Sequence, residues 1–105
     1  MAITIVGNGG ELIYFEKMDD TQTGSIEVSM AKARTAALFK RPTKAFSDAV
    51  AGGASALLSM PGVIAISGGA PLMSHGKMIG ALGVSGGTSA QDAAIADTGL
   101  RVKLD

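Results

Sequence analysis

The chain has 105 residues, enough for a single compact domain over residues 1–105. Nine basic and nine acidic residues cancel, so neither nucleic acid nor an anionic membrane surface is expected as a partner. Cysteine is absent, which excludes a disulfide framework and a thiolate metal site. With no signal-peptide pattern and no apolar run near the roughly 20 residues of a membrane helix, we expect a cytoplasmic protein.

A β-hairpin is the first predicted element. Residues 2–6 are apolar and largely β-branched, and residues 11–17 form a second strand-like segment whose side chains alternate between two faces. The sequence Gly-Asn-Gly-Gly at 7–10 separates them and is a strong turn signal. We therefore expect two antiparallel strands joined by a tight turn.

Two helices are expected next. The first begins at Ser25, whose side chain suits an N-cap, and ends near Phe39, because Pro42 prevents its continuation. The second is capped by Thr43 and ends near Ala51, where two glycines follow. Residues 54–60 could form a helical turn or irregular structure.

The rest of the chain predicts short strands and a last helix. The strands are expected at 63–67, 70–74 and 77–85. His75-Gly76 is expected to form the tight turn between the last two, and Ser89 to cap a helix that Gly99 ends. Hairpin-linked strands separated by helices indicate an α+β domain, with an antiparallel sheet of about five strands and helices packed on it.

Six short motifs occur in order along nearly the whole chain. They are Ile5-Val6-Gly7, Lys17-Met18-Asp19, Lys32-Ala33-Arg34-Thr35-Ala36, Pro42-Thr43, Gly68-Gly69-Ala70-Pro71, and Gly80 to Gly86 followed by Gln91-Asp92. Each is weak alone, but together they resemble the GlcG/HbpS family of haem- or corrinoid-associated domains, also seen as the C-terminal part of PduO-type proteins. The resemblance implies a GlcG/HbpS-like fold, haem or corrinoid as cofactor, and dimers or larger rings.

The chain departs from the family pattern in two places. Gly7 stands where the family usually has Asp, so any role of that carboxylate is absent. Family members usually begin with an amphipathic helix, whereas this sequence starts at the first strand, so we expect a fold that lacks the N-terminal helix. Either the reading frame is set too short, or a neighbouring chain covers the sheet face that the missing helix would leave partly uncovered.

Self-assembly is also expected from the apolar content. Apolar residues make up 47% of a small domain, whose ratio of core to surface is poor. The first helix has an apolar stripe, and Val28 and Phe39 lie nearly opposite it. The stripe is Ile26, Met30, Ala33 and Ala37. We therefore expect a homo-oligomer, a dimer or larger.

Ser85, Gly86 and Gly87 are candidate ligand-binding residues. A strand that runs through a Gly-Gly turn into a helix leaves several backbone N–H groups free, which favours an anion such as a haem propionate or a small carboxylate. Residues 83–87 also match the G-x-S-x-G pattern of a nucleophile elbow. We reject this interpretation, because the catalytic triad of that fold has its histidine after the serine, whereas the only histidine here precedes it. The alternative is a turn that serves helix–strand packing.

Residues around the predicted turn at 75–76 are the candidates for contact with a tetrapyrrole. His75 is the only imidazole and so the candidate haem-iron ligand among histidines, with Tyr14 or a methionine as the other usual choices. Met73 and Met78 flank the turn, where they could line the face of a porphyrin or corrin. The alternatives are a solvated turn histidine and methionines that fill gaps in a core.

Lys32 and Thr35 belong to a family motif and, by the resemblance, keep a ligand-binding role in which the lysine pairs with a ligand carboxylate. Lys40 and Lys44 are expected to be solvated residues of a helix edge. The leading function is binding of haem or a related tetrapyrrole. An enzyme or accessory subunit in small-organic-acid catabolism without a bound metal, and a purely structural assembly unit, stay open.

Overall fold

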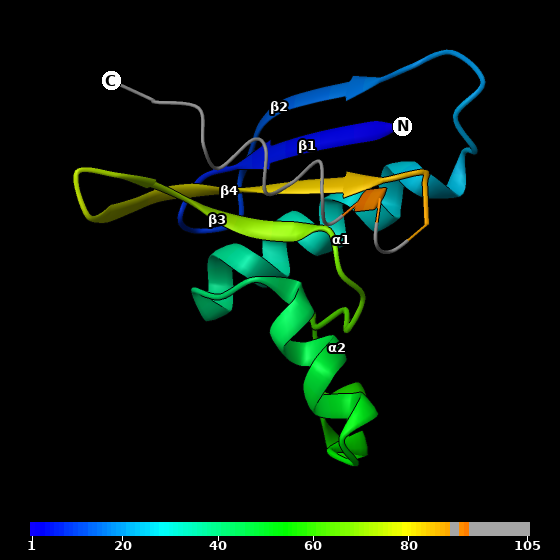
Figure 1. Cartoon of the computed structure of the whole chain (residues 1–105). Helices are drawn as coiled ribbons and strands as arrows, with labels where there is room; N and C mark the ends of the chain where they lie inside the picture. Colours follow the sequence, from blue (N-terminus) through cyan, green and yellow to red (C-terminus); the bar gives the residue numbers. More distant parts are fainter. Residues whose placement is uncertain (89–90, 93–105) are drawn as a thin grey trace.

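The computed structural model describes residues 1–88 and 91–92. It consists of an antiparallel sheet with helices on one side. The strands are β1 (Ala2–Val6), β2 (Leu12–Lys17), β3 (Gly69–Ser74) and β4 (Lys77–Ser85), in the order β2-β1-β4-β3. The helices are α1 (Gly24–Phe39), α2 (Thr43–Ala51) and the 3-10 helix η1 (Ser55–Ser59). Helix α1 lies against the sheet and α2 extends away from it (Figure 1). The predicted α+β class is confirmed.

Both predicted hairpins are confirmed. β1 pairs with β2, and β3 pairs with β4, each antiparallel. His75 and Gly76 have φ angles of 50° and 77°, the positive values that a two-residue turn of type I′ requires. β1 also pairs with β4, so the first strand lies in the middle of the sheet.

Small residues let α1 approach the sheet very closely. Ser29 and Ala33 are fully buried on α1, and a Cβ atom added to Gly83 of β4 would overlap the carbonyl oxygen of Ser29. The hydroxyls of Ser29 and Thr4 share a hydrogen bond of 2.8 Å across this contact. The core between helix and sheet is Val6, Ala33, Ala36, Ala37 and Ala81.

The predicted apolar stripe of α1 is half right. Ala33 and Ala37 are buried as expected, whereas Ile26 and Met30 are only half-buried. Small side chains hold most of the buried positions instead, among them Ser25, Ser29 and Thr35, because the close approach to β4 leaves little room for large ones. The long side chain of Lys32 is buried as well.

The far side of α1 is partly covered by α2. The rings of Phe39 and Phe46 meet edge to face, with centroids 5.6 Å apart. Phe39 is half-buried, so its contact with Phe46 accounts for part of the apolar character of that position within the chain.

The predicted strand at 63–67 is wrong. Ile64 donates its N–H to the hydroxyl of Thr35 at 3.1 Å, and that hydroxyl donates to the carbonyl oxygen of Gly62 at 3.1 Å. A side chain of α1 thus supplies the hydrogen bonds that a neighbouring strand would have supplied, and the sheet of the described residues has four strands rather than about five.

The predicted helix starts need small corrections. Helix α1 begins at Gly24, with Ser25 buried in its first turn. Thr43 is the first residue of α2 but does not cap it, because its hydroxyl accepts the N–H of Gly69 at 2.8 Å. The expected last helix, from Ser89 to Gly99, lies outside the described residues except for positions 91–92. The expected absence of the family's N-terminal helix stays a prediction.

Candidate functional site

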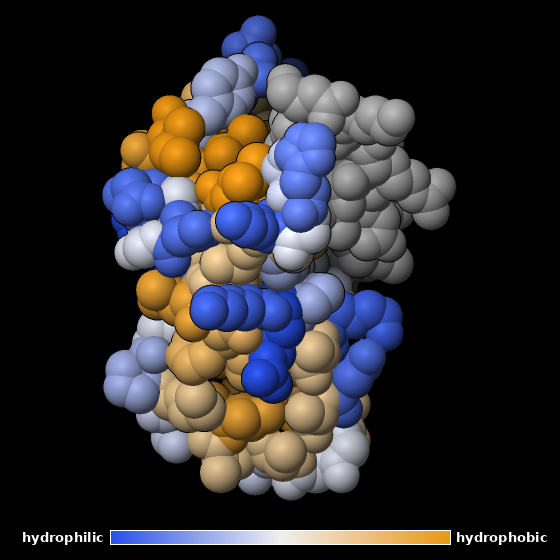
Figure 2. All heavy atoms as spheres, turned by 90° about the vertical axis from the view of Figure 1, so that its left-hand side faces the viewer, coloured by the Kyte–Doolittle hydropathy of each residue, from blue (hydrophilic) through white to orange (hydrophobic). Residues whose placement is uncertain are grey.

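An open pocket of about 730 Å³ lies beside the β3–β4 hairpin. Ligand pockets in proteins are typically about 300–1,000 Å³. Figure 2 shows the face of the molecule to which this hairpin points, where a band of hydrophilic side chains crosses between hydrophobic areas. The pocket is lined by Asn8, Lys40, Pro42, Pro71, Met73, Lys77 and Met78.

Turns and one hairpin pair bring the lining residues together. Met73 and Met78 are direct partners across β3 and β4, which confirms that they lie close to one another. Lys40 ends α1 in the left-handed conformation, with a φ angle of 54°, and so reverses the chain before Pro42. Asn8, in the β1–β2 turn, donates from Nδ2 to the carbonyl oxygen of Met78 at 2.9 Å. The pocket is therefore built from three separate parts of the chain.

His75 lies at the tip of the same hairpin. It is exposed and is not among the residues that line the pocket. It stands two positions from both Met73 and Lys77, which do line it. A ligand would therefore have to extend beyond the mouth of the pocket to contact this imidazole.

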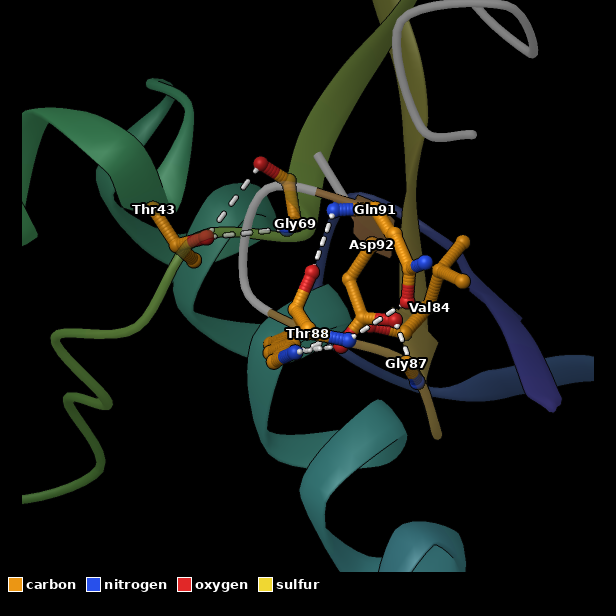
Figure 3. Close-up of polar contacts among 8 residues, drawn as sticks. Thr43, Gly69, Val84, Gly87, Thr88, Gln91 and Asp92 are labelled. Carbon is orange, nitrogen blue, oxygen red and sulfur yellow. Dashed lines mark hydrogen bonds and ion pairs between the residues drawn. The ribbon is translucent and has the colours of Figure 1, made fainter. Parts of the chain in front are cut away.

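A second polar cluster lies at the opposite end of β4 (Figure 3). Lys32 is 1% exposed, and its Nζ donates to Oδ2 of Asp92 at 3.0 Å and to the carbonyl oxygen of Val84 at 2.9 Å. The other oxygen of Asp92 accepts the N–H of Gly87 at 2.9 Å. A Cβ atom at Gly68 would lie 2.7 Å from the carbonyl oxygen of Val84 and 2.9 Å from Nζ, and the φ angle of 127° there disfavours any other residue, so the position next to the lysine requires glycine.

These contacts use the donors that the sequence predicts to be free. The N–H of Gly87 binds Asp92, and the N–H of Thr88 donates to Oε1 of Gln91 at 2.9 Å. In return, the N–H of Gln91 donates to the hydroxyl of Thr88 at 3.2 Å, which completes a capping box. The expectation of free N–H groups is wrong at these two positions, because the chain supplies its own acceptors. Ligand binding by Ser85, Gly86 and Gly87 stays a prediction.

The structure divides the predicted site residues into separate groups. Met73 and Met78 line the pocket with His75 near them, whereas Lys32 and the turn at 85–87 lie at the other end of β4. Thr35 is fully buried and holds the loop at 62–64. The predicted ligand-binding residues therefore do not form one site.

Sequence reasoning missed the polar side of the pocket. Lys40 lines it although it is predicted to be merely solvated, and Asn8 and Lys77 are not singled out at all. The sequence feature that could have indicated this position of Lys40 is Pro42, because proline forces the chain to reverse just after the helix. Lys44, in contrast, forms an exposed ion pair with Asp48 at 2.7 Å, as a solvated helix edge would.

Tyr14 lies on β2, at the opposite edge of the sheet from β3. Its hydroxyl donates to Oε2 of Glu16 at 3.1 Å. This hydrogen bond, together with the negative charge of Glu16, raises the pKa of Tyr14 above its ordinary value of 10.0. Because Tyr14 lies at the far edge of the sheet and does not line the pocket, it is not a pocket residue.

Replacing Glu16→Gln is expected to lower the pKa of Tyr14 toward its ordinary value, because the amide carries no charge. The chain has one tyrosine, so ultraviolet titration of tyrosinate reports on this residue alone. Stability from this contact is present below the ordinary pKa and is lost as the pH rises through the raised one, since the folded state holds the proton more tightly. Identical titration curves for both proteins would contradict the contact.

Within residues 1–88 and 91–92, no group of three or more histidine, aspartate and glutamate residues is placed to hold a metal ion. No helix of that part of the chain has both the length and the apolar character to cross a membrane.

The sheet order, the helices on one face and the open pocket define a small α+β domain with room for a ligand of moderate size. Residues 1–101 match the family described as haem degrading protein HbpS-like. The chain belongs to this family, as the resemblance of its motifs predicts.

Two curated relatives show how much of a longer protein the chain covers. It is 38% identical over 104 residues to an uncharacterized 15.0 kDa protein of the dhaT-dhaS intergenic region of Citrobacter freundii, covering 95% of this chain and 73% of that protein. It is 39% identical over 85 residues to protein GlcG of Escherichia coli K12, covering 81% of this chain and 63% of GlcG. The chain thus spans less than two thirds of GlcG.

Solved structures share the fold. The crystal structure of Klebsiella pneumoniae protein ORFY matches with a TM-score of 0.85 and 32% identity, over 94% of this chain and 71% of that one. The crystal structure of a PduOC–haem complex matches with a TM-score of 0.82 and 33% identity, over 94% of this chain and 75% of that one. A similar protein has therefore been crystallised with haem.

Proposed function

We propose that this protein binds haem or a related tetrapyrrole in the pocket beside the β3–β4 hairpin. The observation that carries the proposal is the pocket's composition: apolar side chains that suit a flat ring, next to two lysines that suit the ring's carboxylates. Its volume, about 730 Å³, suits a ligand of this size. The similarity to a protein crystallised with haem supports the same ligand class.

The residues present fit a haem. Lys40 and Lys77 would pair with its propionates, while Met73 and Met78 would contact the ring. The thioether of either methionine, or the imidazole of His75, would ligate the iron. Haem bound there would supply a redox-active iron, and the apolar wall would restrict its access to water. A corrinoid is the alternative ligand of the same ring class.

Titration of the protein with haemin, followed by the Soret band, tests the proposal. Binding is expected to saturate, and Lys40→Glu and Lys77→Glu should each weaken it roughly ten- to a hundredfold, because each replaces a charge-assisted hydrogen bond with repulsion. Lys44→Glu is the matched control, since Lys44 lies in an exposed pair outside the pocket. A Soret band that does not shift, or equal affinities for the Lys40 and Lys44 variants, would overturn the proposed site.

The same titration assigns the iron ligand. His75→Ala, Met73→Leu and Met78→Leu are expected to divide into one variant that changes the absorption spectrum and two that leave it unchanged. Leucine keeps the apolar wall, so a spectral change with either methionine variant reports loss of the sulfur. If all three spectra match that of the unaltered protein, none of these side chains ligates the iron.

We also propose that the protein works in the cytoplasm, with which its lack of cysteine is compatible.

A further inference from the structure

The β3–β4 hairpin contains a β-bulge beside the pocket. Leu72 pairs with Gly80, whereas the next residue of β3, Met73, pairs with Met78. Ile79 is therefore an extra residue of β4 that no residue of β3 opposes. Bulges are frequent next to binding sites, where they change the direction in which a side chain points. This bulge decides which residue of β4 faces Met73.

The bulge brings Met78 to the pocket face of the sheet. Ala81 packs against α1, and the side chains of a regular strand alternate, so Ile79 would share this face and Met78 would not. Met73 lies on the helix side, because Pro71, two positions earlier, pairs with Ala81. Side chains that face each other across an antiparallel pair share a face, so Met78 lies there too and lines the pocket. Without the bulge, Ile79 would take its place.

The turn at the tip of the hairpin accounts for the bulge. With a two-residue turn at 75–76, Ser74 pairs with Lys77. Between this pair and the pair of Leu72 with Gly80, β4 has one residue more than β3. A turn of three residues would remove the difference and give a regular register. The same sequence therefore has two competing registers, and the contacts around the hairpin decide between them.

Asn8 forms a hydrogen bond that requires the bulge. The backbone N–H and C=O groups of a strand alternate between its two edges. Val84 directs its N–H to the carbonyl oxygen of Gly68, on the β3 side. In a regular strand Met78, an even number of residues away, would direct its carbonyl group to that side as well. The bulge shifts the alternation by one, and the carbonyl oxygen of Met78 accepts a hydrogen bond from Nδ2 of Asn8 at 2.9 Å instead.

We propose that Asn8 is a positioning residue of the pocket: its hydrogen bond selects the bulged register, which keeps the thioether of Met78 on the pocket face and Ile79 out of it. The last pair of β1 with β4 is Val6 with Ala81, and the β3–β4 hairpin extends beyond this point (Figure 1). The side chain of Asn8 therefore holds β4 where the backbone of β1 has ended. The inference rests on the proposed function for its ligand alone, since the position of Met78 can be observed without haem.

Relaxation dispersion of a 13C-labelled methyl group of Met78 tests the role of Asn8 without any ligand, because it measures minor states that exchange in microseconds to milliseconds. The signal is assigned with Met78→Leu. In Asn8→Ala, the minor register is expected to be about three- to tenfold more populated than in the unaltered protein, since one hydrogen bond is lost. Equal populations in the two proteins, or no exchange in Asn8→Ala, would overturn the proposal.

Two further variants show whether the minor state is the regular register. Gly9→Ala alters the same exposed turn but keeps the amide of Asn8, and its Cβ atom would meet only the side chain of Glu11, so the population should equal that of the unaltered protein. Deletion of Ile79 from Asn8→Ala removes the extra residue and should abolish the exchange, because one register is then left. Exchange that survives this deletion, or that Gly9→Ala raises equally, would contradict the selection of register by Asn8.

A diamagnetic porphyrin separates this inference from the haem proposal. Zinc protoporphyrin at saturation is expected to suppress the exchange in Asn8→Ala, because a ligand that contacts Met78 stabilises the register that presents it. If the porphyrin does not bind while the three variants behave as described, the haem site is overturned and the positioning of Met78 by Asn8 is supported. If haemin and the porphyrin bind but Asn8→Ala shows no increase in the minor state, the positioning role is overturned and the haem site is supported.

Discussion

Replacing Lys32→Met is expected to lower the free energy of unfolding by about 3–5 kcal/mol, the usual cost of removing one partner from a buried ion pair. The side chains of Lys32 and Asp92 are 2% and 3% exposed, so loss of the ammonium leaves a buried carboxylate without its counter-charge. The carbonyl oxygen of Val84 loses its donor at the same time. Urea-induced unfolding measures the change.

Two variants separate this effect from a general cost of losing lysine. Lys44→Met removes the lysine of an ion pair whose side chains are both 64% exposed, and should change stability by only about 0–1 kcal/mol. Adding Asp92→Asn to Lys32→Met should recover part of the loss, because asparagine is neutral and its oxygen can still accept the N–H of Gly87. A loss for Lys32→Met as small as that for Lys44→Met would contradict the buried pair.

Gly83→Ala is expected to lower the free energy of unfolding by about 3 kcal/mol or more, near or above the upper end of typical overpacking costs. The added methyl group would overlap the carbonyl oxygen of Ser29 and lie 2.6 Å from the backbone nitrogen of Ala33. Both atoms belong to the backbone of α1, which cannot yield as a flexible side chain would. Helix α1 would have to move away from β4.

Gly24→Ala is the matched control. Gly24 begins α1, and a Cβ atom there would meet nothing within 4 Å. Its stability should equal that of the unaltered protein or exceed it by a few tenths of a kcal/mol, because alanine favours helix. Thermal unfolding of the three proteins gives the comparison. If Gly83→Ala has the same melting temperature as Gly24→Ala, the close approach of α1 and β4 is not present in solution.

Local signals predicted much of this fold. The glycine turns at 7–10 and 75–76 fix both hairpins through positions within a few residues of one another, so a single sequence reveals them. The segment at 63–67 is different. Its apolar run is also compatible with an extended segment whose hydrogen bonds go to the side chain of Thr35, nearly thirty residues away.

The candidate site was predictable only where it is local. Met73 and Met78 could be paired because they belong to one hairpin. The pairing of Lys32 with Asp92 spans 60 residues, and no pattern near either residue predicts it. The same holds for Lys40 and Asn8, which reach the pocket from separate turns. Periodicity and capping describe neighbours in the chain, whereas sites of this kind depend on how distant segments pack.

The position of β1 between β2 and β4 has a consequence for how the chain acquires its structure. Ala2 faces Ser85 across the β1–β4 ladder, so a strand that is synthesised early must wait for one made more than eighty residues later. Pairings between such distant segments slow folding, because a long loop has to close first. The emerging chain can form its first hairpin and helix α1, but the central contact of the sheet has no partner until β4 leaves the ribosome. The sheet of the described residues is therefore completed only after its four strands and the helices between them have been synthesised.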